Sequence, residues 1–301
     1  MHQTNQATRG RVRSIAKVIA GLAILISALT TPYAPAGATS FYGSTYDHAT
    51  GFHLCGNPST AALQAWWANS PFYSIGLYVG GSNGETLGCT DLGTSKWQAA
   101  GNAGLAIHPY FYGNQVSAGC GGQYPSISLT RISLTPATAE AQGEHAADVA
   151  SADALAHSVA GGGVIYFDFE SFTNHSSSCI AAAQAFVRGW THQMNSYTSY
   201  WAGVYGSSCG SALSKFTPSQ IGYTLRYISP YDNAHSPTGV FGLDCLDDNL
   251  WNSNQRIHHT VGGVHKSCGG YAMTVDGDCL DGYTDRPGFS GPLSATCTKF
   301  W

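Results

Sequence analysis

The chain has 301 residues, only 10% of which are charged, and its formal net charge at pH 7 is −4. Four of its 13 Lys and Arg residues but none of its 17 Asp and Glu residues precede residue 37, so the rest of the chain carries a net charge of −8. This acidic balance argues against nucleic acids and anionic membranes as partners.

The first 38 residues have the features of a signal peptide. Four basic residues precede an apolar run at positions 18–29, and two Ala-x-Ala sites follow at 34–36 and 36–38. The run is shorter than the roughly 20 residues of a membrane-spanning helix. We therefore expect residues 1–38 to be removed on export and residues 39–301 to form one domain; an uncleaved anchor is the alternative.

All nine cysteines follow this segment, and export makes disulfide bonds their expected state. They include no Cys-x-x-Cys pair, so we expect no metal site. An odd count leaves one thiol free, buried or bonded to another chain. Cys55 is expected to pair with Cys89. Further pairs are expected among four C-terminal cysteines: Cys245, Cys268, Cys279 and Cys297.

The elements alternate between strand and helix patterns in the first two thirds of the chain. Eight strands are expected at 51–54, 75–80, 105–112, 164–170, 201–205, 223–229, 256–261 and 272–276. Helices are expected at 58–69, 94–102, 136–160 and 179–197. This order predicts parallel βαβ units, and the length is typical of one TIM-type (β/α)8 barrel. The alternative is an open doubly wound sheet, which the absence of a phosphate-binding glycine fingerprint disfavours.

The apolar fourth strand ends in two carboxylates, Asp168 and Glu170. Because side chains alternate along a strand, both point to one face, about 6.6 Å apart along the backbone. Paired carboxylates at the carboxyl end of a barrel strand are typical of glycosidic bond cleavage. We expect Glu170 to be a general acid and Asp168 the neighbouring anion, with Tyr166, Phe167 and Phe169 providing much of their apolar surroundings. The alternative is that one of them caps the following helix.

Other polar and aromatic residues near predicted strand ends are candidates for binding a sugar. Asp276 is expected to end the eighth strand and face the barrel mouth, with Asp278 in the turn that follows. His108 and His259 are expected to have structural roles. The loop at 113–135 could cover a cleft. Four tyrosines are candidate substrate-binding residues, with core packing as the alternative: Tyr78, Tyr110, Tyr112 and Tyr205.

Several segments together resemble one known family. They are residues 51–81 (GFHLCGNPSTAALQAWWANSPFYSIGLYVGG), the central VIYFDFE, WAGVYGSS at 201–208, RIHHTVGG at 256–263 and VDGD at 275–278. They are similar to the bacterial glycoside-hydrolase-like domain catalogued as domain of unknown function 1906. The resemblance covers about residues 43–283, and it implies an exported TIM-type barrel similar to the glycoside hydrolase family 25 lysozymes.

This chain departs from the family in its first strand, where the family typically reads Gly-Phe-Asp. Here the third position is His53, and an imidazole cannot replace a permanent anion. We expect His53 to contribute to substrate binding by donating a hydrogen bond to Glu170 or to a sugar hydroxyl.

The sequence therefore predicts a monomeric protein, secreted or associated with the cell wall, that acts on a glycan such as peptidoglycan. Glu170 would be the acid, and Asp168 would stabilise charge or orient a substrate acetamide. No cofactor is expected. One alternative is a barrel that binds cell-wall glycan without cutting it. Another is a structural surface protein that pairs through its odd cysteine.

Overall fold

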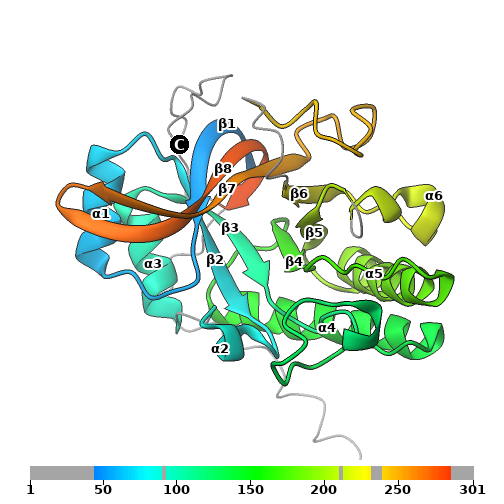
Figure 1. Ribbon diagram of the computed structural model, residues 1–301. Helices are drawn as coiled ribbons and strands as arrows, with labels where there is room; N and C mark the ends of the chain where they lie inside the picture. The colour runs from blue at the N-terminus through cyan, green and yellow to red at the C-terminus, as the bar shows by residue number, and fades with distance from the viewer. Residues whose placement is uncertain (1–43, 90–92, 210–212, 232–238, 286–301) are drawn as a thin grey trace, which may run out of the picture. The chain divides into compact units, whose positions relative to one another are not determined.

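The computed structural model describes residues 44–89, 93–209, 213–231 and 239–285, which form a closed eight-stranded barrel with helices around part of it (Figure 1). The strands follow one another around the barrel in chain order. They are β1 (Ser44–His53), β2 (Ser74–Gly80), β3 (Ala106–Phe111), β4 (Val164–Asp168), β5 (Trp201–Ser207), β6 (Tyr227–Tyr231), β7 (Arg256–Cys268) and β8 (Tyr271–Asp285). The expected α/β barrel is thus confirmed.

The last strand departs from a regular (β/α)8 barrel. Strands β1 to β7 pair in parallel with their neighbours, whereas β8 runs antiparallel to both β7 and β1. The reason is local, because Gly269 and Gly270 adopt positive φ angles of 58° and 84° and turn the chain directly back from β7. The expectation that the eighth strand ends at Asp276 is wrong, since β8 continues nine residues further, to Asp285.

Helices cover the strands of the first two thirds of the chain. Four of them overlap the expected ranges: α1 (Thr60–Asn69), α3 (Gly93–Ala103), α4 (Pro136–Ala156) and α5 (Ser177–Tyr197). The others are single turns: α2 (Gly84–Leu87), α6 (Pro218–Ile221) and two 3₁₀ turns at Ala118–Cys120 and Leu213–Lys215. Among the described residues, none of these helices combines the length and apolar character needed to cross a bilayer.

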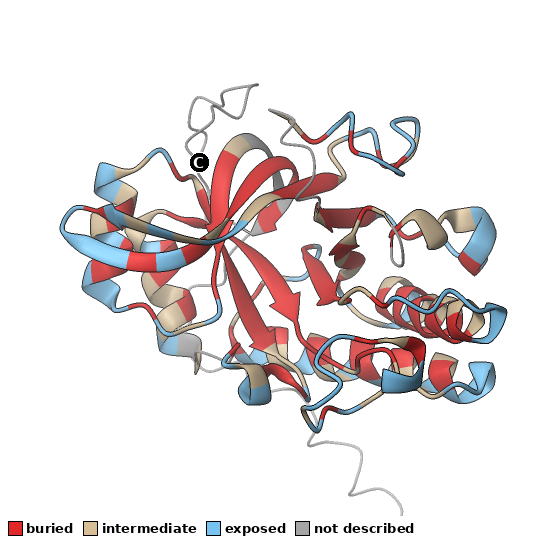
Figure 2. Ribbon diagram, viewed as in Figure 1, coloured by how far each residue is buried: buried red, intermediate tan, exposed pale blue. Residues whose placement is uncertain are grey.

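The two faces of the strands have different chemistry. Figure 2 shows that most strand residues are buried, whereas the outer surfaces of the flanking helices and part of the β7–β8 hairpin are exposed. Outward-facing residues of β4 pack on α5, where the Phe167 ring lies 4.9 Å from that of Phe186 and 5.2 Å from that of Trp190. Phe167 and Phe169 therefore point away from the paired carboxylates, which corrects the expectation that they surround them. The inward-facing residues include Tyr78, Tyr110 and Tyr166.

Three disulfide bonds join described residues. The expected Cys55–Cys89 bond is confirmed, and the others are Cys120–Cys179 and Cys209–Cys245. The sequence analysis expected Cys245 to pair with another of the four C-terminal cysteines. This expectation is wrong, because Cys245 is bonded to Cys209.

Cysteines in the C-terminal part differ in state. Cys279 is disulfide-bonded, whereas Cys268 is a buried free thiol. Cys297, which the sequence analysis grouped with them, lies outside the described residues. Burial raises the pKa of the Cys268 thiol, which makes it less reactive.

Helices α4 and α5 approach each other closely along two glycines (Figure 1). A Cβ atom on Gly143 would overlap the carbonyl oxygen of Phe186 and lie 2.8 Å from the backbone nitrogen of Trp190. A Cβ on Gly189 would lie 2.9 Å from the carbonyl carbon of Glu140. These contacts are with backbone atoms, which cannot move aside as a flexible side chain can.

We therefore expect Gly143→Ala to lower the free energy of unfolding by about 1–3 kcal/mol, as for other overpacked sites. This loss would occur although alanine favours helix over glycine by about 1 kcal/mol. Urea denaturation measures it, with Gly119→Ala as the control because the added Cβ there meets only the Ser117 hydroxyl, at 3.7 Å. Equal stability of wild type and Gly143→Ala would contradict this packing.

Candidate functional site

The paired carboxyl groups lie where β4 ends. Asp168 is the last residue of the strand, and Glu170 follows two positions later. The Gln115 side chain bridges the two backbone positions, donating from Nε2 to the Asp168 carbonyl (2.7 Å) and accepting at Oε1 from the Glu170 amide (3.0 Å). The Phe169 amide also donates to the carbonyl of Tyr205 (3.0 Å). The segment that carries both carboxyl groups is therefore held in place on either side.

Two predicted tyrosines contact these carboxyl groups. The Tyr78 hydroxyl donates to Asp168 Oδ2 at 2.8 Å, and the Tyr112 hydroxyl donates more weakly to Glu170 Oε1 at 3.4 Å. Asp168 is only 3% exposed, and its Oδ1 has no hydrogen-bond partner among the described residues. An ionised carboxylate could accept several hydrogen bonds, but the buried Asp168 side chain accepts one strong bond, from Tyr78.

Burial raises the pKa of both carboxyl groups. For Asp168 the shift is large, because desolvation is reinforced by the negative charge of Glu170 and exceeds the opposing effects of Tyr78 and His53. For Glu170, desolvation and the charge of Asp276 raise the pKa, while the Tyr112 hydrogen bond opposes them. Two such groups titrate as a pair, so the last proton leaves them above the usual carboxyl range.

A second acidic group lies deeper in the barrel and has the opposite character. Asp278 is fully buried, and it accepts from His53 Nδ1 at 3.0 Å and from His108 Nε2 at 3.1 Å. Burial alone would raise the pKa of Asp278, but the charge of His53 and these hydrogen bonds hold it well below its ordinary range. The expectation that Asp278 lies in a turn is wrong, because β8 continues through it and points it inward.

The two histidines that bond Asp278 differ in charge. Burial alone would lower the pKa of His53, but the carboxylates of Asp278 and Asp276 outweigh it and raise this pKa from 6.5 to about 9. Burial lowers the pKa of His108, which the structure confirms as a core residue, so its neutral ring donates from Nε2. Gly76 leaves room for them, since a Cβ there would overlap His53 and lie 2.8 Å from His108 Nε2.

Asp276 completes the acidic group at the mouth. It pairs with His53 across the β1–β8 ladder, and its Oδ2 lies 3.4 Å from His53 Nε2. Its Oδ1 accepts from the Gly263 amide at 2.5 Å. Asp276 therefore faces the barrel mouth, as expected, although β8 continues past it. The predicted bond from His53 to Glu170 is not seen, because Asp276 and Asp278 occupy both ring nitrogens of His53.

The remaining predicted tyrosines, Tyr110 and Tyr205, lie beside this group, with their ring centroids 5.9 Å apart. Tyr205 donates to His259 Nδ1 (3.0 Å), because His259 Nε2 donates to the Val261 carbonyl (3.0 Å). Tyr110 lies deeper, where its hydroxyl bonds Ser229 at 3.0 Å. Burial and the charge of His53 lower the pKa of His259 to about 3.

A pocket of about 280 Å³ opens above these residues. Glu170 and Asp276 line it, whereas the more deeply buried Asp168 is not among its lining residues. Its wall also includes Tyr205, His259, Gln123 and Tyr124. The pocket therefore exposes Glu170 to a ligand and keeps Asp168 beneath it.

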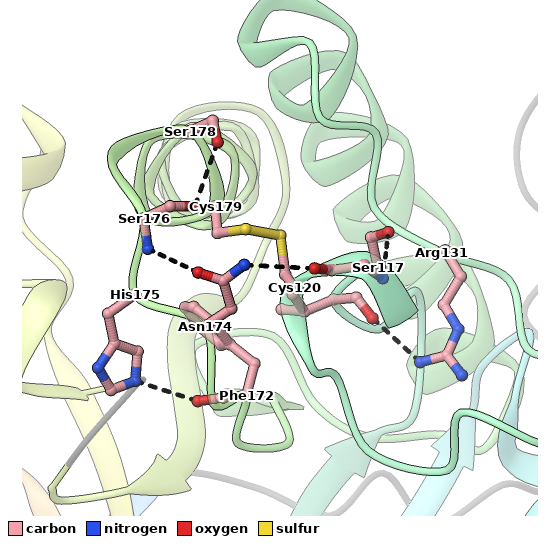
Figure 3. The surroundings of a disulfide bond; sticks show 11 residues. Ser117, Cys120, Arg131, Phe172, Asn174, His175, Ser176, Ser178 and Cys179 are labelled. Atoms are coloured by element: carbon pink, nitrogen blue, oxygen red, sulfur yellow. Dashed lines mark hydrogen bonds between the residues drawn. A yellow bond between two sulfur atoms is a disulfide. The ribbon is translucent and has the colours of Figure 1, made fainter.

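The loop at 113–135 forms part of this wall, as its position after β3 predicts. Figure 3 shows the Cys120–Cys179 bond that ties the loop to α5. The Arg131 guanidinium donates to the carbonyls of Val116, Gln123 and Tyr124 at 2.8–3.0 Å. Tyr124 itself has a positive φ of 54° and is 40% exposed, so the tethered loop presents its ring at the pocket.

Sequence reasoning missed some residues of this site. His259 was expected to be structural but lines the pocket, because register shifts in β7 interrupt the regular alternation beside it. Gln115 and Tyr124 lie in a loop, where no periodicity indicates direction. The position of Asp278 could have been predicted from the sequence. It lies two residues from Asp276, and residues two apart in a strand point to the same face.

Within the part of the chain that the structure describes, two groups of side chains have the composition of a metal site. One is His53, His108 and Asp278; the other is His53, His259 and Asp276. The first is wholly buried, and the second includes residues that line the pocket.

These features define a class: a closed α/β barrel of the glycoside-hydrolase-like kind, with one carboxyl group of a pair lining a pocket at the carboxyl ends of its strands and the other buried beneath it. The profile of the family described as "Rv2525c-like, glycoside hydrolase-like domain" matches residues 64–280, and the chain belongs to this family. The family resemblance drawn from the sequence is thereby confirmed.

Solved structures are similar to this chain at low identity. An uncharacterized B. stearothermophilus protein is 12% identical, with a TM-score of 0.50 over 77% of this chain and 96% of its own. The Tat-secreted protein Rv2525c of Mycobacterium tuberculosis, crystallised with L-tartrate, is 14% identical, with a TM-score of 0.48 over 77% and 95%. The modular autolysin LytC of Streptococcus pneumoniae is 11% identical, with a TM-score of 0.48 over 76% and 46%. No curated protein sequence matches the chain.

The raised pKa of Asp168 has a consequence for stability. Because the folded-state pKa exceeds the ordinary value of 3.8, the folded protein binds this proton more tightly than the unfolded chain does. The free energy of unfolding therefore falls as the pH rises from about 3.8 through the higher pKa that Asp168 has in the folded protein. We expect Asp168→Asn to raise the free energy of unfolding at neutral pH by about 1–3 kcal/mol.

Urea denaturation of both proteins at neutral and acidic pH measures this effect. The added stability of Asp168→Asn should vanish once the pH falls below the pKa of Asp168 in the unfolded chain. Aspartic acid in the wild type and asparagine in the variant are then both neutral. A variant that is less stable than wild type at neutral pH would show that ionised Asp168 is favourably solvated.

Proposed function

We propose that this protein is an exported glycosidase that acts on a cell-wall or extracellular glycan containing N-acetylated sugars, such as peptidoglycan. Glu170 is the general acid, and Asp168 stabilises charge and orients the substrate. The observation that carries the proposal is the placement of these two carboxyl groups. Glu170 lines the pocket, Asp168 lies buried beneath it, and burial raises the pKa of both.

Glu170 has what a proton donor needs. A general acid works best when its pKa lies near the pH at which the enzyme operates. Desolvation and neighbouring negative charge raise the pKa of Glu170 toward that range. Once Glu170 has given its proton to the leaving oxygen, the same carboxylate can accept a proton from the attacking water.

Asp168 suits a substrate-assisted reaction. Its Oδ2 is held by Tyr78, whereas its Oδ1 has no partner among the described residues. Once Asp168 is ionised and a substrate reaches below the present pocket floor, that oxygen can accept the N–H of a substrate acetamide. The acetamide oxygen then attacks the anomeric carbon, the glycosidic C–O bond breaks, and the leaving oxygen takes its electron pair together with the proton of Glu170. Water opens the cyclic intermediate, which is a recognised alternative to a protein nucleophile.

Disulfide bonds support an extracellular location. Three of them join described residues, and disulfides persist mainly in oxidising compartments. The expected signal peptide, residues 1–38, lies outside the described residues. We propose that the mature chain begins at residue 39 and is secreted or retained at the cell wall as a monomer.

A second candidate function is glycan binding without hydrolysis, and the contacts of His53 favour it. The related domains typically carry aspartate at this position. With histidine at this position, the mouth has one carboxylate fewer than those domains. In addition, the imidazole of His53 pairs with two of the remaining carboxylates, Asp276 and Asp278. Less negative charge would then remain to stabilise the cationic transition state of glycoside cleavage.

We expect the wild-type protein to release reducing ends from purified peptidoglycan or chitin oligomers, and Glu170→Gln to lower the rate about 10²–10⁴-fold, the usual contribution of a general acid. Glutamine is similar to glutamate in size and shape, but its amide cannot transfer a proton to the leaving oxygen. Glu144→Gln, on the helix α4 that flanks the barrel, is the matched control and should retain full activity.

Co-sedimentation with the same polymers separates the two candidate functions. If wild type and Glu170→Gln both pellet with the glycan and neither releases reducing ends, the protein is a binding barrel. In that case, regained release in His53→Asp would identify the imidazole as the cause. Full activity of Glu170→Gln would contradict the proposed acid.

A further inference from the structure

We propose that His53, His259 and Asp276 form a binding site for a divalent transition-metal ion of the Zn²⁺ type in the pocket beside Glu170. Each residue offers one ligand atom, and these atoms all lie within 4.8 Å of one another. This site departs from the expectation, drawn from the scattered cysteines, that the protein holds no metal. It does not depend on the proposed hydrolysis.

The donor set and its spacing suit such an ion. Two imidazoles and one carboxylate are typical ligands of Zn²⁺, with bonds of about 2.0–2.2 Å in tetrahedral geometry. Ligand atoms at those bond lengths lie roughly 3.3–3.6 Å apart. His53 Nε2 and Asp276 Oδ2 are 3.4 Å apart, within this range and at the long end for a hydrogen bond.

Each of the three side chains is already oriented by a second bond. His53 Nδ1 bonds Asp278 at 3.0 Å, which directs Nε2 toward Asp276. Asp276 Oδ1 accepts from the Gly263 amide, which leaves Oδ2 facing His53. Metal-binding histidines in proteins are commonly fixed in this way, by a carboxylate or a backbone carbonyl on the other ring nitrogen.

The third ligand follows the same pattern. His259 Nε2 donates to the Val261 carbonyl, so Nδ1 carries the lone pair. That lone pair now accepts from the Tyr205 hydroxyl at 3.0 Å. The ion would replace this hydrogen bond and would also displace a proton from His53 Nε2, whose pKa is raised to about 9, so both losses oppose binding.

An irregularity in β7 helps to bring the ligands together. Its register against β8 shifts between His259 and Val261 and again before Val264. Gly263 lies within the second shift with φ of 67°, a conformation that glycine adopts without strain, and its amide reaches Asp276. Bulges of this kind often redirect side chains beside functional sites.

The deeper group of His53, His108 and Asp278 does not fit an ion as well. Its nitrogen–oxygen distances of 3.0–3.1 Å are those of ordinary hydrogen bonds, and all three residues are buried. The Asp276 side chain, by contrast, is 29% exposed, so an ion can reach it from the pocket. Three protein ligands also leave a fourth coordination position, for water or a substrate oxygen.

Isothermal titration of Zn²⁺ into the untagged, metal-free mature chain tests the proposal. We expect saturable binding of one ion per chain, with affinity at least tenfold weaker in Asp276→Asn and in His259→Ala, in line with the loss of a ligand. His265→Ala is the matched control, because this exposed histidine of β7 lies outside the three-ligand group, and it should bind as wild type does.

A crystallographic measurement keeps the test independent of variant stability. Anomalous diffraction at the zinc edge from Zn²⁺-soaked wild-type crystals should give a peak among the three side chains. Absence of both saturable binding and this peak would overturn the proposal. So would a peak elsewhere, such as at the Cys268 thiol, or binding that persists unchanged in both ligand variants.

Discussion

The burial of carboxyl groups inside a closed barrel is the constraint on which this site depends. An ionised carboxylate away from water is costly unless a positive charge or several hydrogen bonds compensate for it. The barrel meets this cost in two ways. Asp278 keeps its charge because His53 and His108 bond it. Among the described residues, Asp168 accepts a side-chain hydrogen bond only from Tyr78 and is favoured in its protonated form. One end of the barrel thus holds the ion pair of Asp278 with His53 and, close to it, the protonated carboxyl group of Asp168.

The topology of the last strand makes this arrangement possible. Because β8 runs antiparallel beside β1, Asp276 lies opposite His53 and Asp278 lies opposite Gly51. Gly76 of β2 leaves space for His53 and His108, because a Cβ there would overlap His53 and lie 2.8 Å from His108 Nε2. The imidazole then lies between two carboxylates. An imidazole here, where the sequence resemblance leads us to expect aspartate, changes the charge of the mouth, and it supplies one of the three ligands proposed for a metal ion.

Much of the fold could be predicted because it follows from local periodicity. The four long helices and the apolar β4 have clear patterns, and strand alternation correctly placed Asp168 and Glu170 on one face. The direction of β8 could not be predicted in this way, since it depends on a turn at Gly269 and Gly270 that resembles any glycine-rich loop. Contacts such as Gln115 with the backbone of Asp168 join residues far apart in sequence, and no spacing rule predicts them.

The measurement that tests the central claim most directly is a carboxyl ¹³C NMR titration of wild type and Glu170→Gln, labelled at Asp and Glu side chains. The account predicts that Asp168 loses its proton well above the usual range of about 3–5. It also predicts that removing the Glu170 charge lowers the pKa of Asp168. Ionisation of both groups within the usual range, with Asp168 unchanged in Glu170→Gln, would contradict the raised and coupled pKa values on which the proposed chemistry rests.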